Sequence, residues 1–372
     1  MNIFNVYPIN DITPVTGSGS KLWDDKGEEY LDLYGGHAVI SIGHSHPAYV
    51  SAICDQVSKL GFYSNSVNVP QQQELASKLG KLSGLDDFEL FLANSGAEAN
   101  ENALKMASFH NGRKNIIAFS KGFHGRTAGA VAVTDNPNIQ APINSADHVT
   151  ILPFNDVEAL KAAVNDDTCA VIVEGIQGVG GIQVASDEFM HAIREACDAH
   201  GAIFIHDSVQ CGYGRSGKFF TFQHSGVLPD IVCMAKGMGN GFPIGGILLA
   251  PKFKASFGLL GTTFGGNHLA CRAAIAVLDT IEKENLIANA EKLGAYAIAE
   301  LKNIPGIKEV RGKGLMIGIE LEGPVKDVRN KLLFEEHIFT GVSGANTIRL
   351  LPSLAVTKEE LDTFIQALKK LL

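Results

Sequence analysis

The stretch DEFMHAIREACDAHGAIFIHDSVQ, residues 187–210, contains the two patterns that decide the fold. Its first part, Asp187–His200, places apolar residues at the spacing of an amphipathic helix. Its second part, Ala202–Asp207, is an almost continuous apolar run that ends in an acid, which is typical of a strand covered on both faces of a parallel sheet. A helix that leads directly into such a strand predicts an α/β fold.

The same alternation extends over the central part of the chain. Six runs are expected to be strands: Leu90–Ala93, Asn115–Phe119, Ala170–Glu174, Ala202–Asp207, Ile231–Ala235 and Gly246–Ala250. Between the first two, the segment Ala97–His110 carries an apolar stripe at helical spacing, made of Ala99, Ala103, Met106 and Ala107. We therefore expect a mostly parallel central sheet with helices on both faces.

The pattern changes after Gly266, where longer helices and fewer strands are expected. Asn267–Glu284 and Asn285–Asn303 have helical spacing, whereas Lys308–Val310 and Leu315–Leu321 resemble strands. A last helix begins at a capping box and carries a clear apolar stripe; the residues concerned are Thr357, Glu360, Leu361, Phe364, Ile365 and Leu368.

These changes predict three parts. Residues 1–45 form an N-terminal arm that belongs to the smaller domain, residues 46–266 form a large α/β domain, and residues 267–372 form the rest of a small α+β domain.

Composition excludes several classes of protein. The 372 residues include 19% charged and 45% hydrophobic ones, a balance that excludes an intrinsically disordered chain. The net charge of −9 argues against a nucleic-acid partner and against binding to an anionic membrane. An anionic substrate must then be bound by individual Arg or Lys side chains.

The six cysteines are scattered, with no CxxC pair, and most lie in apolar stretches. We expect them to be reduced thiols in the core. The first residues show no signal-peptide pattern, and no apolar run approaches the roughly 18 residues that span a bilayer. These features predict a soluble, cytoplasmic protein.

Three segments carry candidate chemistry. The first, NSGAEAN (Asn94–Asn100), opens a helix with small residues, whose free backbone N–H groups suit a phosphate; the alternative is an ordinary helix cap by Ser95. The second places Asp207 at the carboxyl end of a buried strand, where α/β sheets bind ligands; the alternative is a turn or cap. The third is Lys236, directly after an apolar strand; the alternative is a lysine that extends from the sheet to solvent.

Together the three segments supply parts of a pyridoxal 5'-phosphate site. They offer a phosphate cradle, an acid for the pyridine nitrogen and a lysine that holds the cofactor covalently. Burial of Lys236 would lower the pKa of its amine and make it nucleophilic.

The order of motifs resembles the class III aminotransferases of the ornithine and acetylornithine type. The motifs are NSGAEAN (Asn94–Asn100), FHGR (Phe123–Arg126), IQG (Ile176–Gly178), DSVQCGYGRSG (Asp207–Gly217), AKGMGNGFPIG (Ala235–Gly245) and GTTFGGN (Gly261–Asn267). The similarity extends over nearly the whole chain. It implies a fold type I pyridoxal-phosphate transferase that works as a homodimer.

The resemblance also implies roles for single residues around the cofactor. Ser95, Gly96 and Ala97 would bind the phosphate, and Phe123 and Val209 would pack on the two ring faces. The remaining roles are Asp207 at the ring nitrogen, Gln210 near the ring hydroxyl, Lys236 as the covalent lysine, and Thr263 at the phosphate of the neighbouring subunit.

Three further residues would bind substrates. Thr262 would lie beside the substrate. Arg126 would bind the α-carboxylate of an ornithine derivative, and Arg349 the carboxylate of the keto acid. Two guanidinium groups at different distances from the cofactor suit a donor that reacts at its far amine and one that reacts at its α-amine.

The chain departs from the family's pattern at four positions. Val179 stands where a glutamate is common, so Arg349 lacks the carboxylate that pairs with it in the family. His37, Ser208 and His268 also differ from the usual residues, and we expect them to alter the substrate pocket more than the chemistry.

The predicted activity is transfer of the δ-amino group of an N2-acylornithine, by default acetylornithine, to 2-oxoglutarate, as in arginine biosynthesis. N-succinylornithine is the nearest alternative, followed by free ornithine or 4-aminobutyrate as donors, and then a semialdehyde aminomutase. From another class, a nicotinamide-dependent dehydrogenase would use the glycine-rich turn after Lys236. No metal is expected, because His44 and His46 lack further ligands at a supporting spacing.

Overall fold

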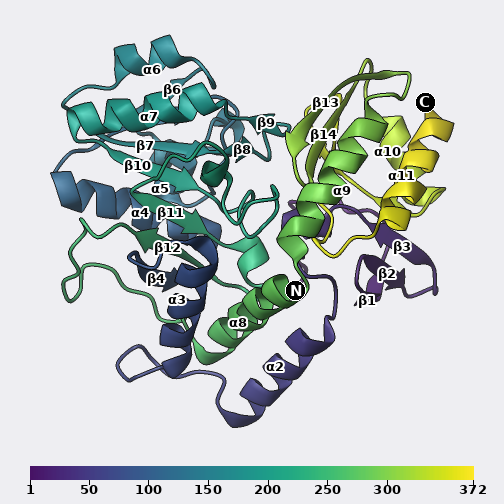
Figure 1. The fold of residues 1–372 in the computed structure, drawn as a ribbon, viewed down its shortest axis with the longest axis horizontal. Coiled ribbons are helices and arrows are strands. Elements are labelled where there is room, and N and C mark those ends of the chain that lie inside the picture. The colour runs from purple at the N-terminus through teal and green to yellow at the C-terminus, as the bar shows by residue number, and fades with distance from the viewer.

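The computed structural model describes residues 1–372 and shows two lobes (Figure 1). The larger lobe is built on a seven-stranded sheet with the order β4-β12-β11-β10-β7-β5-β6. Its strands are β4 (Glu89–Ala93), β5 (Asn115–Phe119), β6 (Val149–Leu152), β7 (Thr168–Glu174), β10 (Ile203–Asp207), β11 (Ile231–Met234) and β12 (Gly245–Leu249). The sheet is parallel except at β12, which runs antiparallel to both of its neighbours.

Helices cover both faces of this sheet, as the apolar strands predicted (Figure 1). Along β7, Ala170 and Ile172 pack in the same cluster as Ala103, whereas Val171 and Val173 pack with Phe189 in the other. The helices of the larger lobe are α2 (Pro47–Lys59), α3 (Pro70–Ser83), α4 (Gly96–Asn111), α5 (Ala128–Ala132), α6 (Val157–Ala163), α7 (Asp187–His200) and α8 (His268–Lys283). The α/β fold with a mostly parallel central sheet is confirmed.

The smaller lobe joins both ends of the chain. Its sheets are β13-β14-β17-β16 and β1-β2-β3-β15, and in the second sheet β3 (Glu29–Asp32) pairs in parallel with β15 (Ile338–Phe339). The other elements are β1 (Pro14–Ser18), β2 (Lys21–Asp24), β13 (Ile307–Lys313), β14 (Met316–Leu321), β16 (Gly341–Ser343), β17 (Thr347–Leu350), α9 (Leu286–Leu301), α10 (Lys326–Phe334) and α11 (Lys358–Leu371). This pairing supports the assignment of residues 1–45 to the smaller domain, and the domain boundaries stay a prediction.

The remaining elements are short. They are α1 (Gly35–Ala38), β8 (Ile176–Gln177), β9 (Gln183–Val184) and four 3-10 turns at Pro137–Ile139, Pro142–Asn144, Thr221–His224 and Lys236–Met238. Both strands expected after Gly266 form, as β13 and β14. Three further strands, β15, β16 and β17, were not predicted, because they are only two to four residues long.

The cysteines and two histidines can be compared with the expectations from the sequence. Five cysteines are buried and all six are free, but Cys54 is exposed on α2. His44 and His46 each contact a carboxylate, on Asp32 at 2.8 Å and on Glu284 at 3.0 Å. None of the helices combines the length and the apolar character needed to cross a bilayer.

Candidate active site

A cavity of about 320 Å³ lies at the carboxyl ends of the parallel strands. Its walls come from the segments that follow β4, β5, β10 and β11 and from the last residue of β7. The lining residues are Gly96, Ala97, Asn100, Phe123, His124, Gly125, Arg126, Glu174, Asp207, Val209, Gln210 and Lys236. The structure therefore brings together most of the residues that the sequence singled out, at the edge where α/β sheets bind ligands.

The start of α4 is shaped for an anion. Ser95 is the N-cap, and its hydroxyl accepts a hydrogen bond of 3.2 Å from the backbone N–H of Glu98. Gly96 and Ala97 are the first helical residues, so their N–H groups have no acceptor within the helix and face the positive end of its dipole. Ser95 therefore caps the helix with its side chain, while the N–H groups of Gly96 and Ala97 stay free for a phosphate. The two interpretations of this segment are compatible.

Close packing at this helix start requires glycine. A Cβ on Gly96 would lie 2.6 Å from Cγ1 of Val209, a side chain that lines the same cavity. A Cβ on Gly125, which has a φ of +138°, would lie 2.8 Å from the Cβ of Ala97. These two contacts bring the loops after β4, β5 and β10 against one another around the cavity.

Asp207 is fixed by a set of hydrogen bonds at the end of β10. Its Oδ2 accepts 2.7 Å bonds from Nδ2 of Asn100 and from Nδ1 of His124, and its Oδ1 accepts a 3.0 Å bond from the N–H of Val209. The side chains of Asn100, His124 and Asp207 are each at least 97% buried. The carboxylate therefore has a single orientation toward the cavity.

The electrostatics of this group favour an ionised Asp207. Burial opposes its charge, but the hydrogen bond and the charge of His124 outweigh burial and hold the pKa of the carboxyl below its usual range. Burial likewise opposes protonation of His124, yet its hydrogen bond to Asp207 raises the pKa of the ring above the ordinary value. An ionised carboxylate fixed in this way can stabilise a positive charge in the cavity.

Lys236 begins the turn after β11 with an unusual backbone. Its φ is +48°, in the left-handed region that non-glycine residues rarely adopt, and such strain is concentrated at functional sites. Burial lowers the pKa of its amine from the ordinary value, and Arg349 lowers it further, against the opposing charges of Asp207 and Glu174. A lysine of this kind is a candidate nucleophile.

Glu174 is a site residue that the sequence did not reveal. Its two carboxylate oxygens accept backbone N–H bonds from Phe123 at 3.0 Å and from Gly178 at 3.1 Å, so it ties two loops to the end of β7. Burial raises the pKa of this carboxyl to about 7. Its place as the last residue of β7, like that of Asp207 at the end of β10, is the signal that could have identified it.

Two other residues were quoted in motifs without a role. Asn100 lies one helical turn after Gly96 and therefore faces the same side of α4, and His124 is the residue next to Phe123. Only the fold shows that both side chains meet at Asp207.

The two predicted substrate arginines have opposite surroundings. Arg126 is exposed at the cavity and has no hydrogen-bond or ion-pair partner, so its guanidinium is free to bind an anion. Arg349 is only 5% exposed, on β17, and donates to the carbonyl oxygens of Val342 and Gly178 and to the hydroxyl of Tyr34. It is outside the lining of the cavity but contacts Gly178, which Glu174 also binds.

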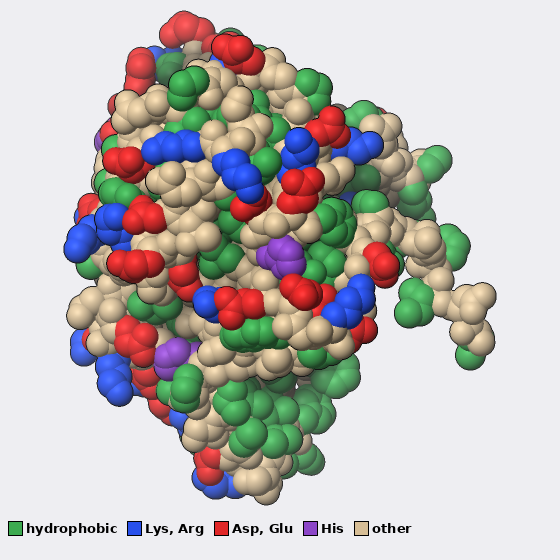
Figure 2. Space-filling model, turned by 90° about the vertical axis from the view of Figure 1, so that its right-hand side faces the viewer, with side chains coloured by type: hydrophobic (Ala, Val, Ile, Leu, Met, Phe, Trp, Pro, Cys, Tyr) green, Lys and Arg blue, Asp and Glu red, His purple; other side chains and the backbone are tan.

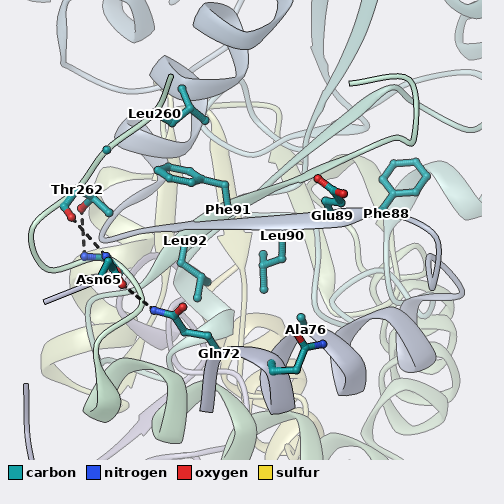
Figure 3. A pocket seen from close by; sticks show the side chains of 13 residues that line it. Asn65, Gln72, Ala76, Phe88, Glu89, Leu90, Phe91, Leu92, Leu260 and Thr262 are labelled. Carbon is teal, nitrogen blue, oxygen red and sulfur yellow. Dashed lines mark hydrogen bonds between the residues drawn. The ribbon is translucent and has the colours of Figure 1, made fainter. Parts of the chain in front are cut away.

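Thr262 and Thr263 lie away from this cavity. Thr262 borders a second, larger hollow of about 570 Å³ beside the edge strand β4, shown in Figure 3. There the side-chain amide of Asn65 contacts the carbonyl oxygen of Thr262 at 3.4 Å and also the amide of Gln72 (Figure 3). Thr263 is exposed. The roles assigned to both threonines stay predictions.

The residues present fit pyridoxal 5'-phosphate. A cavity of about 320 Å³ lies within the range of small-molecule sites, and it places an amine, a buried carboxylate, an aromatic ring and a free helix N-terminus on one space. The buried Oε1 of Gln210 has no partner, although its Nε2 donates to the carbonyl oxygen of His37 at 3.2 Å. An unpaired buried acceptor next to Lys236 suits a ligand hydroxyl.

Comparisons with known proteins agree with this geometry. The family described as aminotransferase class-III matches residues 5–372. A protein named acetylornithine aminotransferase from Methanopyrus kandleri is 41% identical over 97% of this chain and 94% of its own length, and its namesake from Methanocaldococcus jannaschii is 42% identical over 98% and 94%.

Solved structures show the same fold. The ornithine aminotransferase of Toxoplasma gondii superimposes with a TM-score of 0.93 at 28% identity, covering 99% of this chain and 92% of that one. An aminotransferase from Bacillus anthracis gives a TM-score of 0.92 at 27% identity, covering 100% and 96%. The chain belongs to the class-III aminotransferase family.

Proposed function

We propose that the protein is a pyridoxal-phosphate-dependent aminotransferase that moves the δ-amino group of N2-acetylornithine to 2-oxoglutarate. The observation that carries the proposal is the single cavity in which Lys236, Asp207 and the free guanidinium of Arg126 meet. The relatives that are about 40% identical over nearly the full chain, all named acetylornithine aminotransferases, support this donor.

Each residue of the cavity has a defined task in such a reaction. When bound, pyridoxal phosphate supplies a carbonyl group that exchanges amines and a protonated ring that withdraws electrons. The amine of Lys236 would hold the cofactor and then, once released, move a proton at the reacting carbon. Asp207, held by His124 and Asn100, would keep the proton on the ring nitrogen.

The remaining residues would position the cofactor. The N–H groups of Gly96 and Ala97 would bind the phosphate at the helix start. Phe123 and Val209 would pack against the ring faces, and Gln210 would use its unpaired Oε1 at the ring hydroxyl.

The two arginines would separate the two substrates. Arg126, exposed at the cavity, would bind the α-carboxylate of the long donor, whose reacting amine lies at its other end. Arg349, buried in the smaller lobe, would bind a carboxylate of 2-oxoglutarate or glutamate. A guanidinium binds carboxylates through two parallel hydrogen bonds, which fixes the orientation of each substrate.

N-succinylornithine is a second candidate donor, favoured by the surroundings of Val179. This apolar side chain is 45% exposed and lines a polar hollow of about 510 Å³ with Lys121, which forms no ion pair. The hollow shares Phe123 with the cofactor cavity. Lys121 could pair with the carboxylate of the succinyl group, and position 179 carries no glutamate to repel it. Of the two acids that line the hollow, Asp135 and Glu320, the second is paired with Arg311.

A nicotinamide-dependent dehydrogenase is not supported. A dinucleotide fingerprint needs its glycine-rich turn to open a helix that leads into a parallel strand. Here the glycines after Lys236 lead through a short 3-10 turn into β12, which is antiparallel to β11.

In a homodimer with a shared active site, Thr263 would bind the cofactor phosphate of the neighbouring subunit. Thr263 is exposed next to Phe264, whose ring lies 5.4 Å from that of Phe62. Figure 2 shows hydrophobic side chains gathered at the lower end of the molecule, the end at which Figure 1 places α2. Exposed apolar residues of α2 and the following segment are Val50, Val57, Leu60, Phe62, Tyr63 and Val67. A surface of this kind indicates a protein interface.

The test of the donor is a steady-state assay. Acetylornithine, succinylornithine and unmodified ornithine are each paired with 2-oxoglutarate, and kcat/KM is compared. The proposal expects the acetyl compound to give the highest value, and a higher value for succinylornithine selects the second candidate. An aminomutase would turn over none of these donors and would instead isomerise an amino semialdehyde without 2-oxoglutarate.

A further inference from the structure

The guanidinium of Arg349 is buried without a carboxylate. Its three hydrogen bonds all go to neutral acceptors: Nε to the carbonyl oxygen of Val342 at 3.0 Å, Nη1 to that of Gly178 at 2.9 Å, and Nη2 to the hydroxyl of Tyr34 at 3.0 Å. No Asp or Glu oxygen lies within 4 Å of it. A buried charge without a counter-ion needs such contacts, and it remains ready to bind an anion.

The hydroxyl of Tyr34 connects Arg349 to His37. Tyr34 Oη lies 2.6 Å from Nδ1 of His37. A guanidinium can only donate, so the tyrosine oxygen accepts from Arg349, and its own O–H can be donated to Nδ1 of a neutral His37. That donation requires a neutral histidine whose Nδ1 carries no proton. Burial lowers the pKa of His37, and the positive charges of Arg349 and Lys236 lower it further, which agrees with a neutral ring.

An unusual turn holds these two side chains over Arg349. Four consecutive residues have positive φ angles: Gly35 at 57°, Gly36 at 53°, His37 at 68° and Ala38 at 63°. Left-handed backbone is strained at each residue that is not glycine, here His37 and Ala38. The turn is nevertheless fixed, because Oδ1 of Asp32 accepts from the N–H groups of Tyr34 and Gly35.

The same turn also touches the cofactor cavity. The carbonyl oxygen of His37 accepts a bond from Gln210, which lines the cavity next to Lys236. The histidine side chain itself is exposed, whereas Arg349 below it is buried. His37 can therefore move outward without disturbing the core of the smaller lobe, and Tyr34, which is half-buried against Gly341, must turn away from Arg349 with it.

We propose that Tyr34 and His37 form a neutral cover on Arg349 that a dicarboxylate displaces, and this proposal rests on the function assigned above to Arg349. The cover occupies Nη2 while an acylornithine reacts. When 2-oxoglutarate or glutamate binds, its carboxylate takes the place of the Tyr34 hydroxyl. Release costs one hydrogen bond to a neutral group, not a buried ion pair, since Val179 supplies no carboxylate here.

Equilibrium binding of glutarate to the holoenzyme tests the cover. Glutarate has the two carboxylates of the keto acid but neither a carbonyl nor an amine, so it binds without reacting, and calorimetry gives its Kd. Tyr34→Phe removes the competing hydroxyl and keeps the ring; we expect glutarate to bind about tenfold more tightly. His37→Gly, which tolerates the positive φ, should tighten binding about threefold because Tyr34 loses its acceptor.

His37→Asn is the matched control. Asparagine accepts the left-handed backbone, and its Oδ1 stands where Nδ1 of the histidine stood, so Kd should equal that of the wild-type protein. If Tyr34→Phe does not fold, the comparison of His37→Gly with His37→Asn decides alone. Equal Kd values for those two variants, or weaker glutarate binding by Tyr34→Phe, would overturn the proposal.

Arg349→Ala shows where glutarate binds. Loss of binding in this variant places the dicarboxylate at Arg349, and unchanged binding overturns the cover. This outcome is independent of the amino donor, because glutarate contains no amine. A failure of the acetylornithine assay would therefore leave the glutarate result intact, and the two proposals fail separately.

Discussion

Nδ1 of His124 lies 2.7 Å from Oδ2 of Asp207, with both side chains at least 97% buried. The histidine comes from the loop after β5 and the aspartate from the end of β10, so the contact joins two strand ends across the cavity. Because the pair is shielded from water, the charge of each partner stabilises that of the other more strongly than at the surface.

Replacing His124 should therefore weaken the reaction without abolishing it. His124→Phe removes the bond to Asp207, and a hydrogen bond to a charged group is worth about 1.5–3 kcal/mol. We expect kcat to fall by about 10- to 100-fold in steady-state assays. His124→Asn is the control, since its Nδ2 can donate from the position of Nδ1 and should recover much of the loss. Equal activities of the two variants would contradict a role through Asp207.

Removal of the exposed arginine should affect one substrate only. Arg126→Ala deletes a guanidinium that has no other partner, so the fold should be unaffected and KM for the acylornithine should rise about 10- to 100-fold. The half-reaction with glutamate, followed by stopped-flow absorbance, should keep its rate. Slowing of both half-reactions to the same degree would remove the assignment of Arg126 to the donor.

A methyl group on Gly96 should disturb the phosphate cradle. Gly96→Ala would place a Cβ 2.6 Å from Cγ1 of Val209, and overpacking costs about 1–3 kcal/mol. Cofactor affinity, measured by absorbance after dialysis, should fall about tenfold or more. The control is Gly323→Ala, where no atom lies within 4 Å of the new methyl group. An unchanged cofactor Kd in Gly96→Ala would show that this helix start does not hold the phosphate.

Much of the larger lobe was predictable because its strands are buried on both faces. The six expected strands all form, with ends shifted by at most two residues. The seventh, β6, was missed because it is a four-residue edge strand in which Thr150 and Ile151 are exposed. The antiparallel direction of β12 was also not predicted, since an apolar run such as Gly246–Ala250 is the same in either direction.

The site was predictable where a residue type and its place at a strand end agreed, as for Asp207 and Lys236. Tyr34 and His37 were not assigned to Arg349, because their contact depends on a left-handed turn and on a distant strand. Glu174 was missed as a site residue for a similar reason, since its partners are backbone groups of two loops that only the fold brings together.

Acid should destabilise the folded protein through the buried His206. Its ring is 0% exposed, with Nδ1 2.7 Å from Oγ of Ser208 and Nε2 without a partner. Burial lowers its pKa to about 4 from 6.5, so the unfolded chain binds a proton here before the folded one does. The contribution of neutral His206 to the free energy of unfolding is therefore complete above pH 6.5 and is lost as the pH falls toward 4.

The variant His206→Phe should remove this acid sensitivity. Between pH 7 and pH 5 the wild-type protein should lose about 2 kcal/mol more unfolding free energy than the variant, measured by urea denaturation at one protein concentration. His191→Phe, at an exposed histidine, should lose as much as the wild type. Identical pH profiles of His206→Phe and wild type would show that His206 does not stay neutral when folded.

The most direct test of the whole account is borohydride reduction of the purified protein, followed by peptide mass analysis. The account predicts that the peptide containing Lys236 gains a reduced pyridoxyl-phosphate group, and that Lys236→Ala gains none and has lost transamination. A label on another lysine, or full turnover by Lys236→Ala, would contradict it.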